Sequence, residues 1–221
     1  MLYNNIEKEV MSSAVHPYLR NSNKVVYRGI CDIVAGYFRD FDFCDLHILD
    51  IGPGQCDFLD IAKAKGAVTY GIDFEPAVVK LGEMRGHNMT LCNVIKDWPF
   101  KDMVFDGIFC RGSINCYWFI QQGNSYLLQQ FLNQITKSLK PDSWMWIMPW
   151  NKPSPSQVNL VDLYRITIEK WASEAQVNID IFDKDIVNRK ERSGYEVFFD
   201  FTLPSNEIWT KNCTLNNKSR F

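Results

Sequence analysis

The sequence lacks the features of zinc-binding, secreted and membrane proteins. Its seven cysteines are odd in number and contain no C-x-x-C pair, which disfavours a zinc cluster or a disulfide framework and favours a reducing cytosol. No apolar run approaches the roughly 20 residues of a membrane span. The first residues, MLYNNIEKEVMSS, contain no signal-peptide core. We therefore expect a cytoplasmic protein that holds no metal.

The chain also lacks an excess of charge of either sign. Its 24 basic residues nearly balance its 26 acidic residues, so the formal charge is only −2, and the two signs are mixed along the chain. Such a chain produces no strong field that would attract a nucleic-acid backbone or an anionic membrane surface. Nucleic acid and membrane are therefore disfavoured as partners.

Strand-like and helix-like patterns alternate along most of the 221 residues. After an amphipathic helix expected at 24–38, short apolar runs typical of buried parallel strands alternate with helical periodicity. The expected strands contain LHILDIG, AVTYGID, MTLCN, FDGIFC, WMWIMPW, VNIDIF and YEVFFDFTL. This order predicts an α/β fold with a doubly wound sheet. Residues 1–40 are expected to form an N-terminal helical extension or lid, and residues 41–221 the main domain.

A glycine-rich turn, ILDIGPGQCDFLD, joins an expected strand to an expected helix. Gly52 and Gly54 permit a tight turn and a close ligand approach, and the helix N-terminus offers N–H groups to a negative group. Asp73 ends the next strand about 20 residues later, where a carboxylate can accept both hydroxyls of a ribose. The pattern predicts a nucleoside-containing cofactor. The alternative is an ordinary turn, with Asp73 capping the following helix.

The residues around the turn favour one cofactor over another. A dinucleotide fingerprint needs glycine at position 57, where Asp57 would bring its charge close to a pyrophosphate. Asp50 precedes the turn and suits a ligand whose other end carries an ammonium group. S-adenosylmethionine has this shape, since it joins an amino acid, a sulfonium, a ribose and adenine.

Four stretches in this order resemble the class I S-adenosylmethionine-dependent methyltransferases, closest to the small-molecule branch called type 11. They are LDIGPGQC, YGIDFEP, DWPFKDMVFDGIFC and LNQITKSLKPDSWMWIM, and the resemblance runs from Leu46 to Trp150. It implies a Rossmann-like, seven-stranded sheet that is mostly parallel, with the last strand antiparallel and helices on both faces. It also implies methyl transfer. Two departures are Cys56, where the family often has glycine, and Asn93, where it often has an acid.

The candidate site follows from the turn and from these motifs. The expected cofactor-binding residues are Asp50, Gly52, Pro53, Gly54, Asp73, Phe74, Asn93, Val94 and Arg111. No catalytic residue is identified, and the catalytic candidates are His16, which could close over the site as part of a lid, and Arg111, Asn115 and Tyr117, which could contact the substrate. A dedicated base is optional, because methyl transfer from a sulfonium has an activated leaving group and depends mainly on positioning. His47, His87 and Asp106 are interpreted as structural residues.

The sequence therefore predicts a methyltransferase that uses S-adenosylmethionine and acts on a small molecule. The acceptor would be a sugar, a metabolite or a biosynthetic intermediate, methylated at oxygen or nitrogen. Two alternatives stay open. One is a binding module that retains the cofactor turn without chemistry, and the other is an NAD-dependent oxidoreductase.

Overall fold

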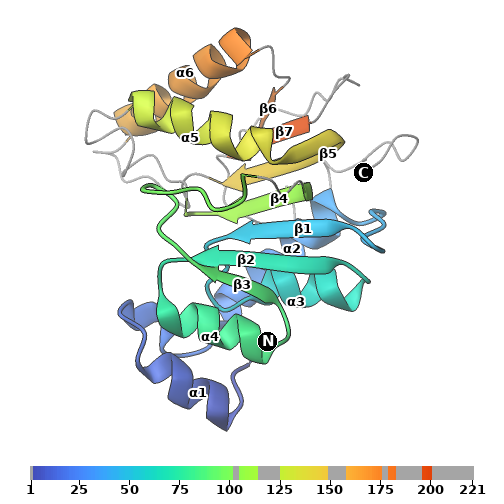
Figure 1. Cartoon of the computed structure of the whole chain (residues 1–221), viewed down its shortest axis with the longest axis vertical. Helices are drawn as coiled ribbons and strands as arrows, with labels where there is room; N and C mark the ends of the chain where they lie inside the picture. Colours follow the sequence, from blue (N-terminus) through green and yellow to red (C-terminus); the bar gives the residue numbers. More distant parts are fainter. Residues whose placement is uncertain are drawn as a thin grey trace. The chain divides into compact units, whose positions relative to one another are not determined.

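The computed structural model describes residues 2–101, 105–113, 125–148, 158–175, 179–182 and 196–200. The chain divides into two compact units, and the described residues of the first run to Asp97 and those of the second begin at Trp98. Each unit combines parallel strands with helices (Figure 1). Among the described residues, no helix has both the length and the apolar character that a membrane crossing requires.

The first unit has a β-α-β-α-β core preceded by helices. Its elements are α1 (Asn5–Ser12), the 3-10 helix η1 (Pro17–Leu19), α2 (Lys24–Tyr37), β1 (His47–Ile51), α3 (Asp57–Ala64), β2 (Val68–Asp73), α4 (Pro76–Met84) and β3 (Asn88–Leu91). β2 lies between β1 and β3 and is parallel to both. α3 packs on β1 and β2, and α4 packs on β2 and β3. Because the three strands are parallel, their carboxyl ends, and the turns that follow them, lie at the same edge of the sheet.

The N-terminal residues pack on the helices of the same unit. α1 begins with a capping box, in which the Asn4 side chain accepts the N–H of Glu7 and the Glu7 carboxylate accepts the N–H of Asn4. α1 lies beside α4 (Figure 1). Buried apolar side chains from both regions form one cluster, which includes Tyr3, Met11, Leu19, Cys56, Leu59, Val78 and Leu81.

A buried arginine strengthens this attachment. Arg85, at the end of α4, donates through Nε to Glu7 of α1 at 2.7 Å and through Nη1 to Asp60 of α3 at 2.6 Å. Asp60 also lies 3.1 Å from Nε2 of His87, whose Nδ1 lies 2.8 Å from the Thr69 hydroxyl. Buried charges are tolerated when they are paired in this way. The network therefore joins α1 to α3, α4 and β2.

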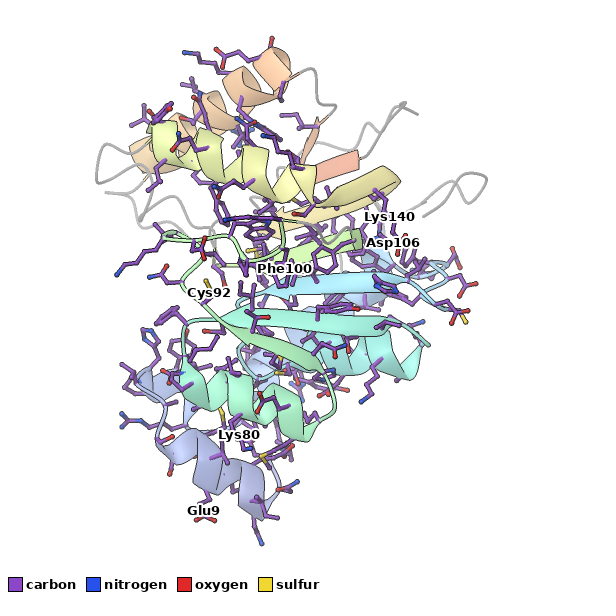
Figure 2. The ribbon with its side chains drawn as sticks, in the orientation of Figure 1. Glu9, Lys80, Cys92, Phe100, Asp106 and Lys140 are labelled. Carbon is purple, nitrogen blue, oxygen red and sulfur yellow. The ribbon has the colours of Figure 1, made fainter. Side chains whose placement is uncertain are left out.

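The second unit contains the remaining strands. Its elements are β4 (Phe105–Arg111), α5 (Ser125–Lys137), β5 (Leu139–Met148), α6 (Val158–Ala175), β6 (Ile179–Phe182) and β7 (Glu196–Asp200). β5 pairs with β4 and β7, and β6 pairs with β7. A Cβ on Gly107 would lie 2.2 Å from the Trp144 indole, so only glycine fits beside that ring. Asp106 and Lys140 form an ion pair at 2.8 Å, and Figure 2 shows them side by side.

The α/β fold with parallel strands is confirmed, with two differences from expectation. The last strand is not antiparallel, because β7 runs parallel to both β5 and β6. The connection 183–195 has the dozen or so residues that a parallel crossover requires, whereas an antiparallel hairpin needs only a short turn. β5 also begins earlier than predicted, at Leu139, and its register with β4 shifts before Trp144. Pro141 lies in this irregular part, where a strand tolerates proline.

Candidate cofactor site

The ends of β1, β2 and β3 are adjacent at one edge of the first unit. The N–H of Gly52, just after β1, donates to the carbonyl of Ile72 in β2 at 2.8 Å. The N–H of Cys92, just after β3, donates to the carbonyl of Asp73 at 2.9 Å. These bonds place the glycine turn and the residues after β3 on either side of Asp73. In open α/β sheets, this carboxyl edge is where ligands bind.

The turn after β1 depends on left-handed backbone conformations. The φ angles are 71° at Gly52, 55° at Gly54 and 61° at Cys56. Glycine adopts such angles without strain, whereas Cys56 adopts one with a fully buried side chain. A Cβ on Gly54 would meet only a Leu19 methyl, at 3.7 Å. α3 begins directly after Cys56, whose side chain caps none of its N–H groups. This arrangement suits a negative ligand group at the N-terminus of α3.

Two buried acids flank this turn. Asp50 lies in β1 opposite Gly71 and is only 3% exposed. Asp57, the first residue of α3, is also buried, and its carboxylate accepts a hydrogen bond from Nε2 of Gln55. Burial raises the pKa of Asp57 above its usual value. Because position 57 is an aspartate, the chain lacks the third glycine of the dinucleotide fingerprint, which that motif needs for close packing of the helix on the strand.

Asp73 ends β2 beside the turn. Its Oδ1 accepts the N–H of Glu75 at 2.9 Å, so it also takes part in the start of α4. Burial raises the pKa of Asp73 to about 6, even though hydrogen bonds from the Glu75 and Phe74 N–H groups and the nearby His16 lower it. The adjacent Phe74 ring is 56% exposed. The edge therefore presents a partly desolvated carboxyl group next to an open aromatic face.

The residues after β3 form a compact turn. The Asn93 side chain accepts the N–H of Ile95 at 3.1 Å, and the Asn93 carbonyl accepts the N–H of Lys96 at 2.8 Å. Asn93 itself is exposed, and Val94 is half-buried. The amide thus shapes the loop where the family often has an acid.

Residues 13–23, between α1 and α2, lie against two of these strand ends. The N–H of Val15 donates to Oε2 of the buried Glu75 at 2.8 Å. The His16 ring meets the Phe74 ring edge-on, with a centroid distance of 5.7 Å. At the other end of the segment, the N–H of Asn23 donates to Oε1 of Gln55 at 2.8 Å. His16 is therefore brought close to the Asp73 region.

The other predicted residues are placed as follows. Arg111 ends β4 in the second unit, and Asn115 and Tyr117 lie outside the described residues. His47 stacks on Tyr70 and lies 3.2 Å from its hydroxyl, whereas His87 bonds to Thr69 and Asp60. In the described part of the chain, no group of three or more His, Cys, Asp or Glu side chains is placed to hold a metal.

Two residues near the site escaped the sequence reasoning. Gln55 and Arg85 both hold the turn, because Nη1 of Arg85 donates to the Gln55 carbonyl at 2.8 Å. Gln55 has a local signal, its position inside the glycine turn. Arg85 has none, since its partners come from distant parts of the chain. The spacing of Asn4 and Glu7, typical of a capping box, would have predicted α1.

The stretch that contains the glycine turn is similar to a known protein family. A family model described as a methyltransferase domain matches residues 49–147, which include Gly52, Gly54 and Asp73. The resemblance seen in the sequence is thereby confirmed. The cofactor of that family is S-adenosylmethionine, as the motifs predict. No curated protein matches the chain.

The chain is similar to several solved methyltransferase structures at low sequence identity. The mitomycin 7-O-methyltransferase MmcR is 16% identical, with 72% of this chain and 49% of that chain covered and a TM-score of 0.50. The sugar N-methyltransferase KedS8 from a Streptoalloteichus species is 19% identical, with 59% and 48% covered and a TM-score of 0.42. A methyltransferase from Archaeoglobus fulgidus is 19% identical, with 70% of each chain covered and a TM-score of 0.49. The chain spans about half the length of the first two.

Proposed function

We propose that this chain transfers a methyl group from S-adenosylmethionine to a small-molecule acceptor, and the match of residues 49–147 to a methyltransferase-domain model supports this. The observation that carries the proposal is the hydrogen bond from Gly52 to Ile72, 2.8 Å long, which places the glycine turn beside the strand that ends in Asp73. One ligand with an amino-acid end and a ribose would engage both features.

The residues of the first unit have distinct roles in holding the cofactor. The turn at Gly52, Pro53 and Gly54, with the N-terminus of α3, suits the carboxylate of the methionine part. Asp50 supplies a negative charge for the ammonium group, and Asp73 accepts hydrogen bonds from the ribose hydroxyls. Phe74, Asn93 and Val94, which follow β2 and β3, would face the adenine side. These residues fit the cofactor by charge and by backbone conformation.

The chemistry requires placement more than proton transfer. When bound, S-adenosylmethionine supplies a methyl group on an already activated leaving group. Correct positioning of two reactants can supply about 7 to 11 kcal/mol of the barrier reduction. His16 is the candidate base for a hydroxyl acceptor, because residues 13–23 bring it against Phe74. Arg111, Asn115 and Tyr117, at and after β4, are candidates for contact with the acceptor.

Charge and composition support a small acceptor in the cytoplasm. The formal charge of −2 offers no field for a polyanion, which favours a sugar, a metabolite or a biosynthetic intermediate. The cysteine pattern supports a cytoplasmic location. The N-terminal extension at residues 1–40 would act as a lid through residues 13–23.

Turnover of methyl-labelled S-adenosylmethionine with amino sugars, phenols, alcohols and carboxylic acids tests the proposal. We expect S-adenosylhomocysteine to form only when an acceptor of one class is present. Asp73→Ala removes charge-assisted hydrogen bonds worth about 1.5 to 3 kcal/mol each, so KM for the cofactor should rise at least about tenfold. The matched control is Asp106→Ala, which removes a carboxylate that is paired with Lys140 in the second unit.

One observation favours a binding module without chemistry. Two of the three histidines, His47 and His87, are engaged in bonds to Tyr70, Thr69 and Asp60. Binding of S-adenosylhomocysteine without turnover on any acceptor class would favour that module. Thermal stabilisation by NAD instead of S-adenosylhomocysteine would favour an oxidoreductase.

A further inference from the structure

We infer that Gln55 is a positioning residue that joins residues 13–23 to the cofactor turn. Packing of this segment against the turn should therefore raise the affinity for the cofactor, and bound cofactor should stabilise the packed segment. The inference rests on the proposed function, because it requires a cofactor at the turn that contains Gly52 and Gly54.

Gln55 uses both ends of its side-chain amide to hold neighbouring elements. Its Oε1 accepts the N–H of Asn23 at 2.8 Å, and its Nε2 donates to the Asn23 carbonyl at 3.0 Å and to the Asp57 carboxylate. Its backbone carbonyl accepts Nη1 of Arg85 at 2.8 Å. Gln55 is only 5% exposed. The glutamine is thus fixed to the turn at one end and to residues 13–23 at the other.

The same segment is attached a second time beyond β2. The N–H of Val15 donates to the Glu75 carboxylate at 2.8 Å, and Leu19 packs 3.7 Å from where a Cβ of Gly54 would lie. The Tyr3 hydroxyl donates to the carbonyl of Leu19 at 3.1 Å. The two attachments therefore flank the strand ends that hold Gly52 and Asp73. A cofactor that spans these strand ends would lie against the segment.

Some side chains of the segment are exposed. Val15 is 69% exposed and Tyr18 is 67% exposed, so neither buries much apolar surface. Partial burial, with the charges of Asp73 and Glu75, raises the pKa of Tyr18. Ala14 and Leu19 of the same segment are buried in the apolar cluster, so the segment combines buried contacts with exposed side chains. Parts of a fold with many exposed side chains open more easily than the core, so the exposed part of this segment is where a ligand at the turn would act.

Thermodynamic linkage converts this arrangement into a measurable effect. Suppose that bound cofactor stabilises the state in which residues 13–23 are packed against the turn. Releasing the segment must then lower the affinity for the cofactor by the same factor. Couplings of this kind are typically about 5- to 150-fold. For one glutamine that makes two hydrogen bonds to the segment, we expect the low end of this range, roughly 5- to 10-fold.

Hydrogen exchange with S-adenosylhomocysteine as the ligand tests the inference. In the wild-type chain, saturating ligand should slow exchange at the Val15 and Asn23 amides roughly 5- to 10-fold. Gln55→Met keeps the length of the side chain and removes both hydrogen-bonding groups. This variant should exchange faster over residues 13–23, bind the ligand more weakly by the same factor, and raise KM for the cofactor while leaving kcat within about twofold. The control is Gln130→Met on α5, whose amide bonds to Tyr126 on the surface, and it should change none of these values.

The outcomes separate the inference from the proposed function. Ligand binding to the wild-type chain without slower exchange over residues 13–23 would overturn the inference, even if Gln55→Met failed to fold. Unchanged affinity in a folded Gln55→Met protein would also overturn it. Absence of ligand binding to the wild-type chain would overturn the proposed function, and the inference with it.

Discussion

We predict that cofactor binding depends on pH, because the pKa of Asp73 is raised into the range just below neutrality. In the free protein, burial raises this pKa to about 6. Ribose hydroxyls donate hydrogen bonds to the ionised carboxylate, so the bound state favours the ionised form. A chain with protonated Asp73 must release a proton before it binds, and the affinity therefore falls as the pH falls. We expect affinity to be constant above about pH 7 and to decline below it.

The size of the decline follows from the pKa. At pH 5, about one tenth of the Asp73 carboxyl groups are ionised, so the affinity should be about tenfold lower than at pH 8. The effect on folding has the opposite sign. Between 3.8 and about 6, the folded chain binds the Asp73 proton more tightly than the unfolded chain does, so this residue's contribution to stability decreases as the pH rises through that window.

Calorimetric titration with S-adenosylhomocysteine at pH 5, 6, 7 and 8 measures this dependence. Asp73→Asn should bind more weakly and lose most of the pH dependence, because it carries no titrating carboxyl group. The charge of His16 lies close enough to Asp73 to lower its pKa, so His16→Gln is the control for this neighbour and should retain a slope if Asp73 causes it. A wild-type profile that is flat from pH 5 to 8, or a slope that persists in Asp73→Asn, would refute the reasoning.

Two further substitutions test contacts inside each unit, the first in the second unit and the other in the first unit. Gly107→Ala places a methyl group 2.2 Å from the Trp144 ring, so thermal unfolding followed by circular dichroism should show a loss of about 1 to 3 kcal/mol; an unchanged melting temperature would contradict this packing. Arg85→Ala leaves the carboxylates of Glu7 and Asp60 without their buried cation and should cost about 3 to 5 kcal/mol in urea unfolding. A double-mutant cycle with Glu7→Gln should give a coupling above about 0.5 kcal/mol, and additive losses would show that the ion pair is not coupled.

Local sequence signals predicted most of the fold and the turn and strand end that make up the candidate site. The apolar runs around His47–Ile51 and Val68–Asp73 predicted β1 and β2, because parallel strands buried on both faces show continuous hydrophobicity. Gly52 and Gly54 predicted the turn, since few other residues adopt positive φ angles. The position of Asp73 followed from the end of the apolar run AVTYGID and its spacing of about 20 residues from the glycines.

Features that depend on distant contacts were not predictable in this way. The direction of β7 is decided by its pairing with β5 and β6, which its own residues do not encode. Arg85 and Gln55 act through partners far away in the sequence, such as Glu7 and Asn23. Cys56 occupies a left-handed position that glycine usually fills, and packing in the surrounding core determines this conformation. Contacts made only after folding therefore explain what the patterns missed.

Titration of S-adenosylhomocysteine into the wild-type chain at neutral pH is the most direct measurement of the cofactor assignment. We expect one molecule to bind per chain, with NAD unable to compete, since the glycine turn and Asp73 match a nucleoside attached to an amino acid. Absence of any binding heat, or displacement of the ligand by NAD, would contradict the assignment of this edge of the sheet to S-adenosylmethionine.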